Sequence, residues 1–277
     1  MHYKIVSDSG VNLRKMEASV DFTTVPLKIR TDEREFVDDP VLDVSEMVAY
    51  LKDYKGKSGT ACPSVSDWLD AFGDAERVFC FTITSTLSGS YNAACVAKAD
   101  YEAEYPERSV FIVDSLSAGP EMQILMEKVA ELIELGKEFE EICNEISAYK
   151  ESTGLMFSLE SLKNLANNGR VSPLVAGVAG ALGIRIVGRA SVGGELEPMD
   201  KCRGEKKALA KIISRMKEMG FKGGKVRVDH CDNLSAAEQL KQQILQEYPK
   251  TDILIGETCG LCSFYAEKGG LMIGFEK

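Results

Sequence analysis

Short apolar runs that end in small polar residues recur through the first half of the chain. The run at 78–83 is continuously apolar, which is typical of a strand covered on both faces in a parallel sheet, and 109–114 predicts another buried strand with a polar end. Runs at 3–10 and 25–29 predict two further strands. Between and after them, the pattern predicts helices over 43–54, from Ser64 through Phe72, and over 91–101, 119–135 and 139–149, with a loop at 55–59. This alternation of strand, polar loop and helix predicts a doubly wound α/β sheet.

The amino-acid composition of the chain changes near residue 150. Residues 155–186 are rich in Gly, Leu, Asn and Val, and 187–198 predicts a hairpin that turns at Gly193-Gly194. Helices are then predicted over 205–219 and 235–248, and strands over 225–230, 253–256 and 270–275. A chain of 277 residues is long enough for two modest domains. We therefore expect an N-terminal α/β domain of residues 1–150 and a C-terminal α/β domain of residues 151–277.

The charge and hydropathy of the chain argue against several functions. Hydrophobic residues make up 44% and charged residues 27% of the chain, as in an ordinary globular protein. The net charge of −10 opposes binding to nucleic acid or to anionic membranes. No targeting signal is visible, and the longest nearly uncharged stretch, 171–184, is too short for a membrane span. We expect a cytoplasmic protein with no stable membrane insertion, whose eight cysteines are reduced.

A loop rich in hydroxyl groups follows the predicted strand that ends at Ile83. Ser85, Thr86, Ser88 and Ser90 cluster there, just before a predicted helix. Free backbone N–H groups and the positive end of a helix dipole favour a carboxylate or a phosphate at such a junction. The commoner role for these residues is helix capping. Both interpretations stay open on the local sequence.

A second loop, 60–64, repeats this arrangement. Thr60 and Ser64 again stand before a helix, and Ser64 is also a candidate cap. Two such loops from one sheet can converge on one anion. Arg170, after a predicted short helix that ends near Asn167, is a candidate partner for an acidic ligand, although most arginines are simply exposed.

Other kinds of chemistry find little support. Cys259 and Cys262 have the spacing of a thiol redox pair, but no second ligand pair suggests a zinc site. His2 and His230 are the only histidines, and no glycine-rich nucleotide signature or other cofactor motif is present. A binding protein is therefore the leading hypothesis. A phosphoryl- or acyl-transfer enzyme, and a redox protein that uses Cys259 and Cys262, are the alternatives.

Several motifs together resemble the DegV family of bacterial proteins. They are the opening strand at 5–9, the Thr-Ala-Cys-Pro-Ser loop at 60–64, the stretch Ile-Thr-Ser-Thr-Leu-Ser-Gly-Ser-Tyr at 83–91, Val-Asp-Ser at 113–115, and Leu-Lys-Asn-Leu at 162–165 with Gly169-Arg170. They occur in the family's order and span nearly the whole chain. The resemblance implies two α/β domains, the first with a mostly parallel sheet flanked by helices and the second with a mixed sheet.

The resemblance also implies a function. It implies a long-chain fatty acid such as palmitate, stearate or oleate, bound in an apolar tunnel without chemistry by this chain alone. The carboxylate would be held by Thr60 and Ser88, with Ser85, the Gly89 amide and Arg170 close by. Some family members present the acid to a separate ATP-binding subunit of a fatty acid kinase.

One stretch departs from the family pattern. The family usually carries a His before Gly-Pro-Gly near the C-terminus, where this chain reads Tyr-Ala-Glu-Lys-Gly-Gly at 265–270. Tyr265 is the candidate for the missing polar contact. Acyl binding is therefore better supported by the sequence than a kinase partnership.

Overall fold

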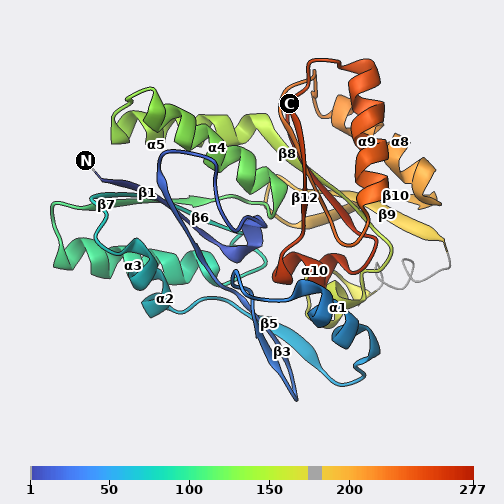
Figure 1. Ribbon diagram of the computed structural model, residues 1–277, viewed down its shortest axis with the longest axis horizontal. Helices are drawn as coiled ribbons and strands as arrows, with labels where there is room; N and C mark the ends of the chain where they lie inside the picture. Colours follow the sequence, from blue (N-terminus) through green and yellow to red (C-terminus); the bar gives the residue numbers. More distant parts are fainter. Residues whose placement is uncertain (1, 174–182) are drawn as a thin grey trace.

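The computed structural model describes residues 2–173 and 183–277. A four-stranded parallel sheet forms the N-terminal part, in the order β2-β1-β6-β7 (Figure 1). Its elements are β1 (Tyr3–Asp8), β2 (Asp21–Val25), β6 (Arg77–Thr82), β7 (Ser109–Asp114), α2 (Val65–Phe72), α3 (Ser90–Glu104), α4 (Pro120–Glu134) and α5 (Phe139–Tyr149). Side chains of α2 and α3 pack on one face of this sheet, and those of α4 and α5 pack on the other. The predicted doubly wound arrangement is thus confirmed.

A small antiparallel sheet projects from this body in the order β4-β3-β5 (Figure 1). It consists of β3 (Lys28–Thr31), β4 (Glu35–Val37) and β5 (Ser58–Ala61), and α1 (Val44–Asp53) follows β4 along the chain. The single strand predicted over 25–29 is wrong, because β2 ends at Val25 and β3 begins at Lys28. Pro26 lies at this break and has no N–H for a strand ladder. The loop predicted at 55–59 is also partly wrong, since its last two residues open β5.

The C-terminal part is a six-stranded mixed sheet in the order β10-β9-β8-β13-β11-β12. Its elements are β8 (Thr153–Leu159), β9 (Ile184–Ala190), β10 (Leu196–Arg203), β11 (Val226–His230), β12 (Ile253–Glu257), β13 (Leu271–Glu276), α8 (Glu205–Glu218) and α9 (Leu234–Glu247). The predicted hairpin is β9–β10, and Gly194 in its turn has a φ of 79°. Of two short helices, α10 (Gly260–Ala266) packs against α1 and β3 of the projecting sheet, and α6 (Lys163–Asn167) packs against α10. Most of the nearly uncharged stretch 171–184 lies outside the described residues.

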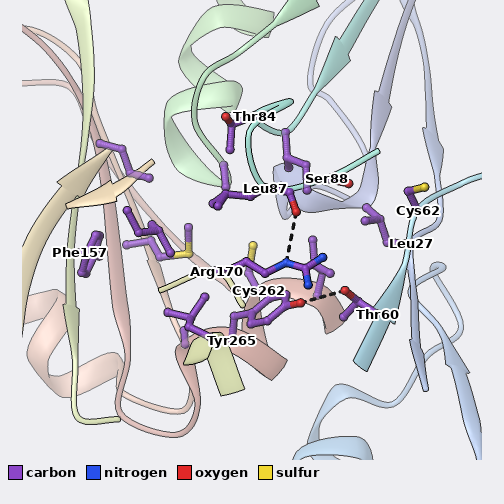
Figure 2. A pocket seen from close by; sticks show the side chains of 18 of the residues that line it. Leu27, Thr60, Cys62, Thr84, Leu87, Ser88, Phe157, Arg170, Cys262 and Tyr265 are labelled. Carbon is purple, nitrogen blue, oxygen red and sulfur yellow. Dashed lines mark hydrogen bonds between the residues drawn. The ribbon is translucent and has the colours of Figure 1, made fainter. Parts of the chain in front are cut away.

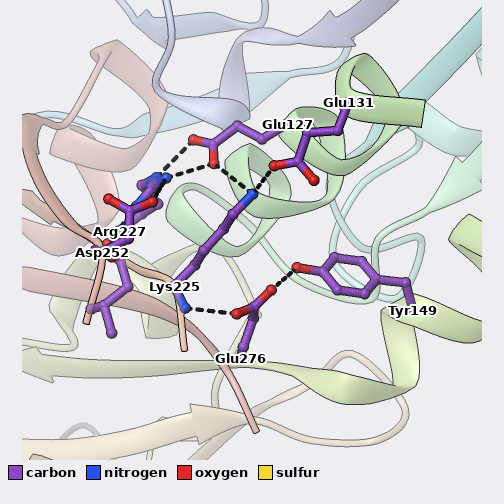
Figure 3. A network of polar contacts seen from close by, with 8 residues as sticks. Glu127, Glu131, Tyr149, Lys225, Arg227, Asp252 and Glu276 are labelled. Atoms are coloured by element: carbon purple, nitrogen blue, oxygen red, sulfur yellow. Dashed lines mark hydrogen bonds and ion pairs between the residues drawn. The ribbon is translucent and has the colours of Figure 1, made fainter. Parts of the chain in front are cut away.

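Helix α4 lies between the two large sheets. Its apolar side chains join the core of the parallel sheet, while its first turn lies against the backbone of β13. Polar contacts also tie it to the mixed sheet, as Figure 3 shows: Arg227 on β11 donates two 2.7 Å hydrogen bonds to Glu127, and Lys225 pairs with Glu131. Tyr149 bonds to Glu276 at the same junction. Because α4 belongs to both packing layers, a domain boundary near residue 150 stays a prediction, although every strand of the mixed sheet begins after that residue.

No helix in the described part of the chain is long and apolar enough to cross a membrane.

Candidate functional site

A cavity of about 330 Å³ lies where the three sheets meet. This volume is within the usual range of ligand sites in proteins. The apolar residues that line it are Leu27, Ala61, Ile83, Leu87, Ala118, Leu155, Phe157, Leu159, Leu165, Leu196, Leu261, Ala266 and Met272. Its polar atoms come from few side chains. The cavity is therefore suited to a ligand that is mostly hydrocarbon.

Strand β8 provides one wall of the cavity. Leu155, Phe157 and Leu159 are alternate residues, so they point to the same face of the sheet, and all three line the cavity. Every residue of β8 is buried, because α8 packs on the opposite face. This strand was missed in the sequence, since a strand buried on both faces shows no alternation of apolar and polar residues.

The polar groups gather at one side of the cavity. The hydroxyl groups of Thr60 on β5 and Tyr265 on α10 share a 2.8 Å hydrogen bond. Only one of the two protons is used in this bond, so the pair retains a donor for a ligand. Burial raises the pKa of Tyr265, so this phenol stays protonated at neutral pH. Figure 2 shows the pair below the Arg170 side chain, with Phe157 on the opposite side of the cavity.

Arg170 lies between the hydroxyl pair and the serine loop at 84–90 (Figure 2). Its Nε donates to the carbonyl oxygen of Leu87 at 3.3 Å, and Nη1 donates to the carbonyl oxygen of Asn168. These bonds fix the plane of the guanidinium group and leave Nη2 without a partner among the described residues. A fixed guanidinium with a free N–H is well suited to a carboxylate.

The serine loop supplies a second set of donors. Ser88 Oγ accepts a 3.2 Å hydrogen bond from the Ser90 amide, which leaves the Ser88 proton available. Helix α3 begins at Ser90, with no side-chain cap at Gly89, and the amides of Ser88 and Gly89 have no partner in the described part of the chain. The helix dipole points its positive end to this place. Ser88 therefore binds one free amide at the start of α3, and the anion interpretation stays intact.

A buried aspartate shapes this loop. Asp8 accepts hydrogen bonds from the Ser90 hydroxyl at 2.6 Å and from the Ile83 amide at 2.9 Å. Burial raises the pKa of Asp8 to about 7. The contacts join the end of β1 to the start of α3, which holds the loop between them.

Glycine at position 89 allows a close approach of the two hydroxyl-bearing segments. A Cβ atom built on Gly89 would lie 3.1 Å from Cys62 Sγ. The expectation that both loops rise from one sheet is wrong, because Thr60 belongs to the antiparallel sheet and the serine loop follows β6 of the parallel sheet. They converge where Cys62, just after β5, lies against Gly89 in the loop that follows β6.

Five of the six site residues predicted from the sequence line the cavity: Thr60, Ser88, Gly89, Arg170 and Tyr265. Ser85 does not. Its amide donates to Asp114 Oδ1 at 3.1 Å, on the side of the loop where Thr86 bonds to the carbonyl oxygen of Gly193 at 2.7 Å. The loop reverses between Ser85 and Ser88, so its two serines face different surroundings.

Helix α10 is held at its start by residues from the N-terminal part. Asp38 accepts hydrogen bonds from the amides of Gly260 at 2.7 Å and Leu261 at 2.8 Å, and Asn12 accepts one from Cys259 at 3.0 Å. Through these contacts, residues distant in sequence set the position of Tyr265. No sequence pattern connects Asn12 or Asp38 with position 265, so this support was not predicted.

Comparison of the whole chain with known proteins identifies its family. Residues 2–277 match the family described as "Uncharacterised protein, DegV family". A DegV domain-containing protein of Streptococcus pneumoniae is 42% identical over all of this chain and 99% of its own length. The chain belongs to the DegV family.

Solved structures of DegV proteins agree closely with the fold. A DegV family protein from Eubacterium eligens, described as loaded with heptadecanoic acid, is 44% identical, with a TM-score of 0.97 over 99% of each chain. The Fak B3 protein of fatty acid kinase from Streptococcus pneumoniae, loaded with linoleic acid, is 42% identical, with a TM-score of 0.98 over 100% of this chain and 99% of its own. DegV relatives of this fold therefore bind fatty acids, and the predicted fold class is confirmed.

Within this DegV chain, the cysteine pair is unsuited to redox chemistry. Cys259 and Cys262 are both buried. Burial, with the nearby Asp38 carboxylate, raises the pKa of Cys259 to about 12 and that of Cys262 well above its usual value. Reactive cysteines show the opposite shift. The described residues also contain no group of three or more metal-ligating side chains.

Proposed function

We propose that this protein binds one long-chain fatty acid in the cavity, with the carboxylate at Thr60, Ser88, Gly89 and Arg170 and the hydrocarbon along β8. One observation supports this most strongly: an apolar cavity ends in hydroxyl, amide and guanidinium donors that converge from separate elements. The ligands named for the E. eligens and S. pneumoniae relatives are of the same class.

The energetics fit such a ligand. Burial of a hydrocarbon chain contributes about 0.8 kcal/mol for each CH₂ group, so a long acyl chain provides most of the affinity. Each hydrogen bond to the carboxylate adds less, and mainly fixes its orientation. Tyr265 supports Thr60 and stands in the stretch where this chain lacks the family's histidine.

The site favours binding over catalysis. An activated hydroxyl nucleophile needs a base within hydrogen-bond reach. Within residues 2–173 and 183–277, the hydroxyl groups of Thr60 and Ser88 bond to no histidine or carboxylate. We therefore expect no turnover of the acid by this chain alone.

A second proposal is that the protein presents its ligand to a separate kinase subunit in the cytoplasm. Gly89 and Cys62 at the polar end are exposed, so the carboxylate end of the cavity faces solvent. The relative named as part of a fatty acid kinase supports this step.

The site assignment is tested by the double replacement Thr60→Val and Ser88→Ala. Loss of one buried hydroxyl partner costs about 1–3 kcal/mol, so palmitate binding measured by calorimetry should weaken roughly tenfold or more. The matched control is Ser85→Ala, a serine of the same loop that lies outside the cavity, which should bind palmitate normally. Unchanged affinity in the double variant would show that the carboxylate binds elsewhere.

A further inference from the structure

A second, smaller cavity of about 100 Å³ adjoins the first. Leu155 lines both cavities, and its side chain is only 1% exposed. Its apolar neighbours are Met272, Cys262 and Ala118, which also line the first cavity, together with Ala190, which lines the second. Leu155 is therefore part of the wall between the two spaces.

The order of residues on β8 gives the direction of the acyl cavity. Leu159 and Phe157 pack in the same apolar cluster as Tyr265, at the polar end, whereas Leu155 packs in another cluster. Phe157 and Leu155 follow on the same face of the strand, at intervals of roughly 6–7 Å. The next residue on this face is Thr153, which lines the second cavity and not the first. The second cavity thus lies at the start of β8, next to the first, and Leu155 stands at their junction.

The second cavity is much more polar than the first. Its charged lining residues are Glu121, Lys150, Glu151, Arg189 and Lys277. Thr153 donates a 2.7 Å hydrogen bond to the buried Glu121, and Lys150 donates to the carbonyl oxygen of Asp114 at 3.0 Å. A methyl end that entered this space would displace water from charged groups without replacing its hydrogen bonds.

Backbone atoms hold the wall in place beside Leu155. Gly274 stands opposite Leu155 on β13. A Cβ atom on Gly274 would lie 2.4 Å from the backbone carbon of Pro120, so the first turn of α4 lies directly against this strand. The junction has little room to widen unless the Leu155 side chain itself changes.

We propose that the Leu155 side chain is the stop at the methyl end of the acyl cavity and sets the longest fatty acid that the protein accepts. This inference rests on the proposed function and adds a length limit to it. Chains that end at Leu155 fill the apolar cavity, whereas longer chains must bend or push their methyl end into the charged space.

The experiment compares the fatty acids retained by wild type and Leu155→Ala after incubation with a mixture of saturated acids of graded length. Mass spectrometry of the extracted ligands gives the length at which retention falls. The replacement removes about three carbon atoms from the stop, so the limit should move up by roughly two to three carbons. Leu155→Phe extends the stop and should move the limit down, which keeps the test decisive if the alanine variant folds poorly.

Leu159→Ala is the matched control. It deletes the same atoms from the same face of the same strand, but at the polar end, so it should lower retention of all acids and leave the length limit unchanged. If wild type retains acids and the Leu155 variants keep its limit, or if Leu159→Ala shifts it equally, the inference is overturned. If wild type retains no fatty acid, the proposed function itself fails.

Discussion

The carboxyl group of Asp229 is buried between two amide side chains at the junction of the large sheets. Asn12 Nδ2 donates to Asp229 Oδ2 at 2.8 Å and Gln123 Nε2 donates to the same atom at 2.9 Å. Asp229 is 1% exposed. Burial takes this carboxyl group out of water and raises its pKa from 3.8 to about 7, although the hydrogen bonds from Asn12 and Gln123 oppose the shift.

This shift predicts a pH-dependent stability that Asp229→Asn removes. A raised carboxyl pKa stabilises the folded state below the unfolded value, near 3.8, and this contribution is lost as the pH rises to about 7. The free energy of unfolding of wild type, relative to the variant, should therefore fall between these pH values by up to about 1.4 kcal/mol per pH unit. Urea denaturation of both proteins at several pH values measures it, and a difference independent of pH would contradict the assignment.

Sequence identified the polar residues of the site better than its apolar residues. Thr60, Ser88 and Arg170 stand at element ends, where hydroxyl and charged groups are conspicuous. The lining residues of β8 look like any other core positions, because burial of both faces removes the pattern that marks a cavity wall. Ser85 and Ser88 are equivalent candidates in the sequence, because spacing alone does not show that the loop reverses between them.

At the scale of elements, the β9–β10 hairpin reaches across the junction and packs on the serine loop. A Cβ atom on Gly194 would lie 2.1 Å from Thr84 Oγ1 and 3.1 Å from the Leu116 Cα atom. The left-handed φ of 79° also favours glycine there. This contact ties the mixed sheet to the loop that carries Ser88.

Gly194→Ala should therefore destabilise the protein more than a glycine-to-alanine replacement whose only cost is the strain of a positive φ. Gly136 provides the comparison, since it has a φ of 73° and no atom within 4 Å of a built Cβ. We expect a loss of about 1 kcal/mol for Gly136→Ala and roughly 2–3 kcal/mol for Gly194→Ala in urea denaturation. Equal losses would show that the hairpin turn does not press on Thr84.

The helices and strands were largely predictable where the sequence shows a periodic pattern of apolar residues or a helix-capping residue. The helix expected over 43–54 is α1 with Asp43 as its cap, and the helix expected from Ser64 is α2, where Ser64 and Asp67 form a capping box. The antiparallel sheet was less visible, because its strands have only three or four residues each. Strands this short contain too few residues to establish an alternation.

At the scale of the whole molecule, the cavity is assembled from segments far apart in the chain. Thr60, Ser88, Arg170 and Tyr265 come from four separate elements or loops, and α4 joins the two large sheets around them. Alternation of elements predicted both α/β regions, but not the packing of α4 on both sheets or the position of the antiparallel sheet. Those depend on tertiary contacts such as Asp38 with α10, which leave no local pattern.

The most direct test of the account is native mass spectrometry of the freshly purified protein, with extraction of any bound lipid. We predict a mass increment of one long-chain fatty acid per chain, which is lost on denaturation. A protein that carries no fatty acid, and takes up neither palmitate nor oleate when they are added, would contradict the central claim.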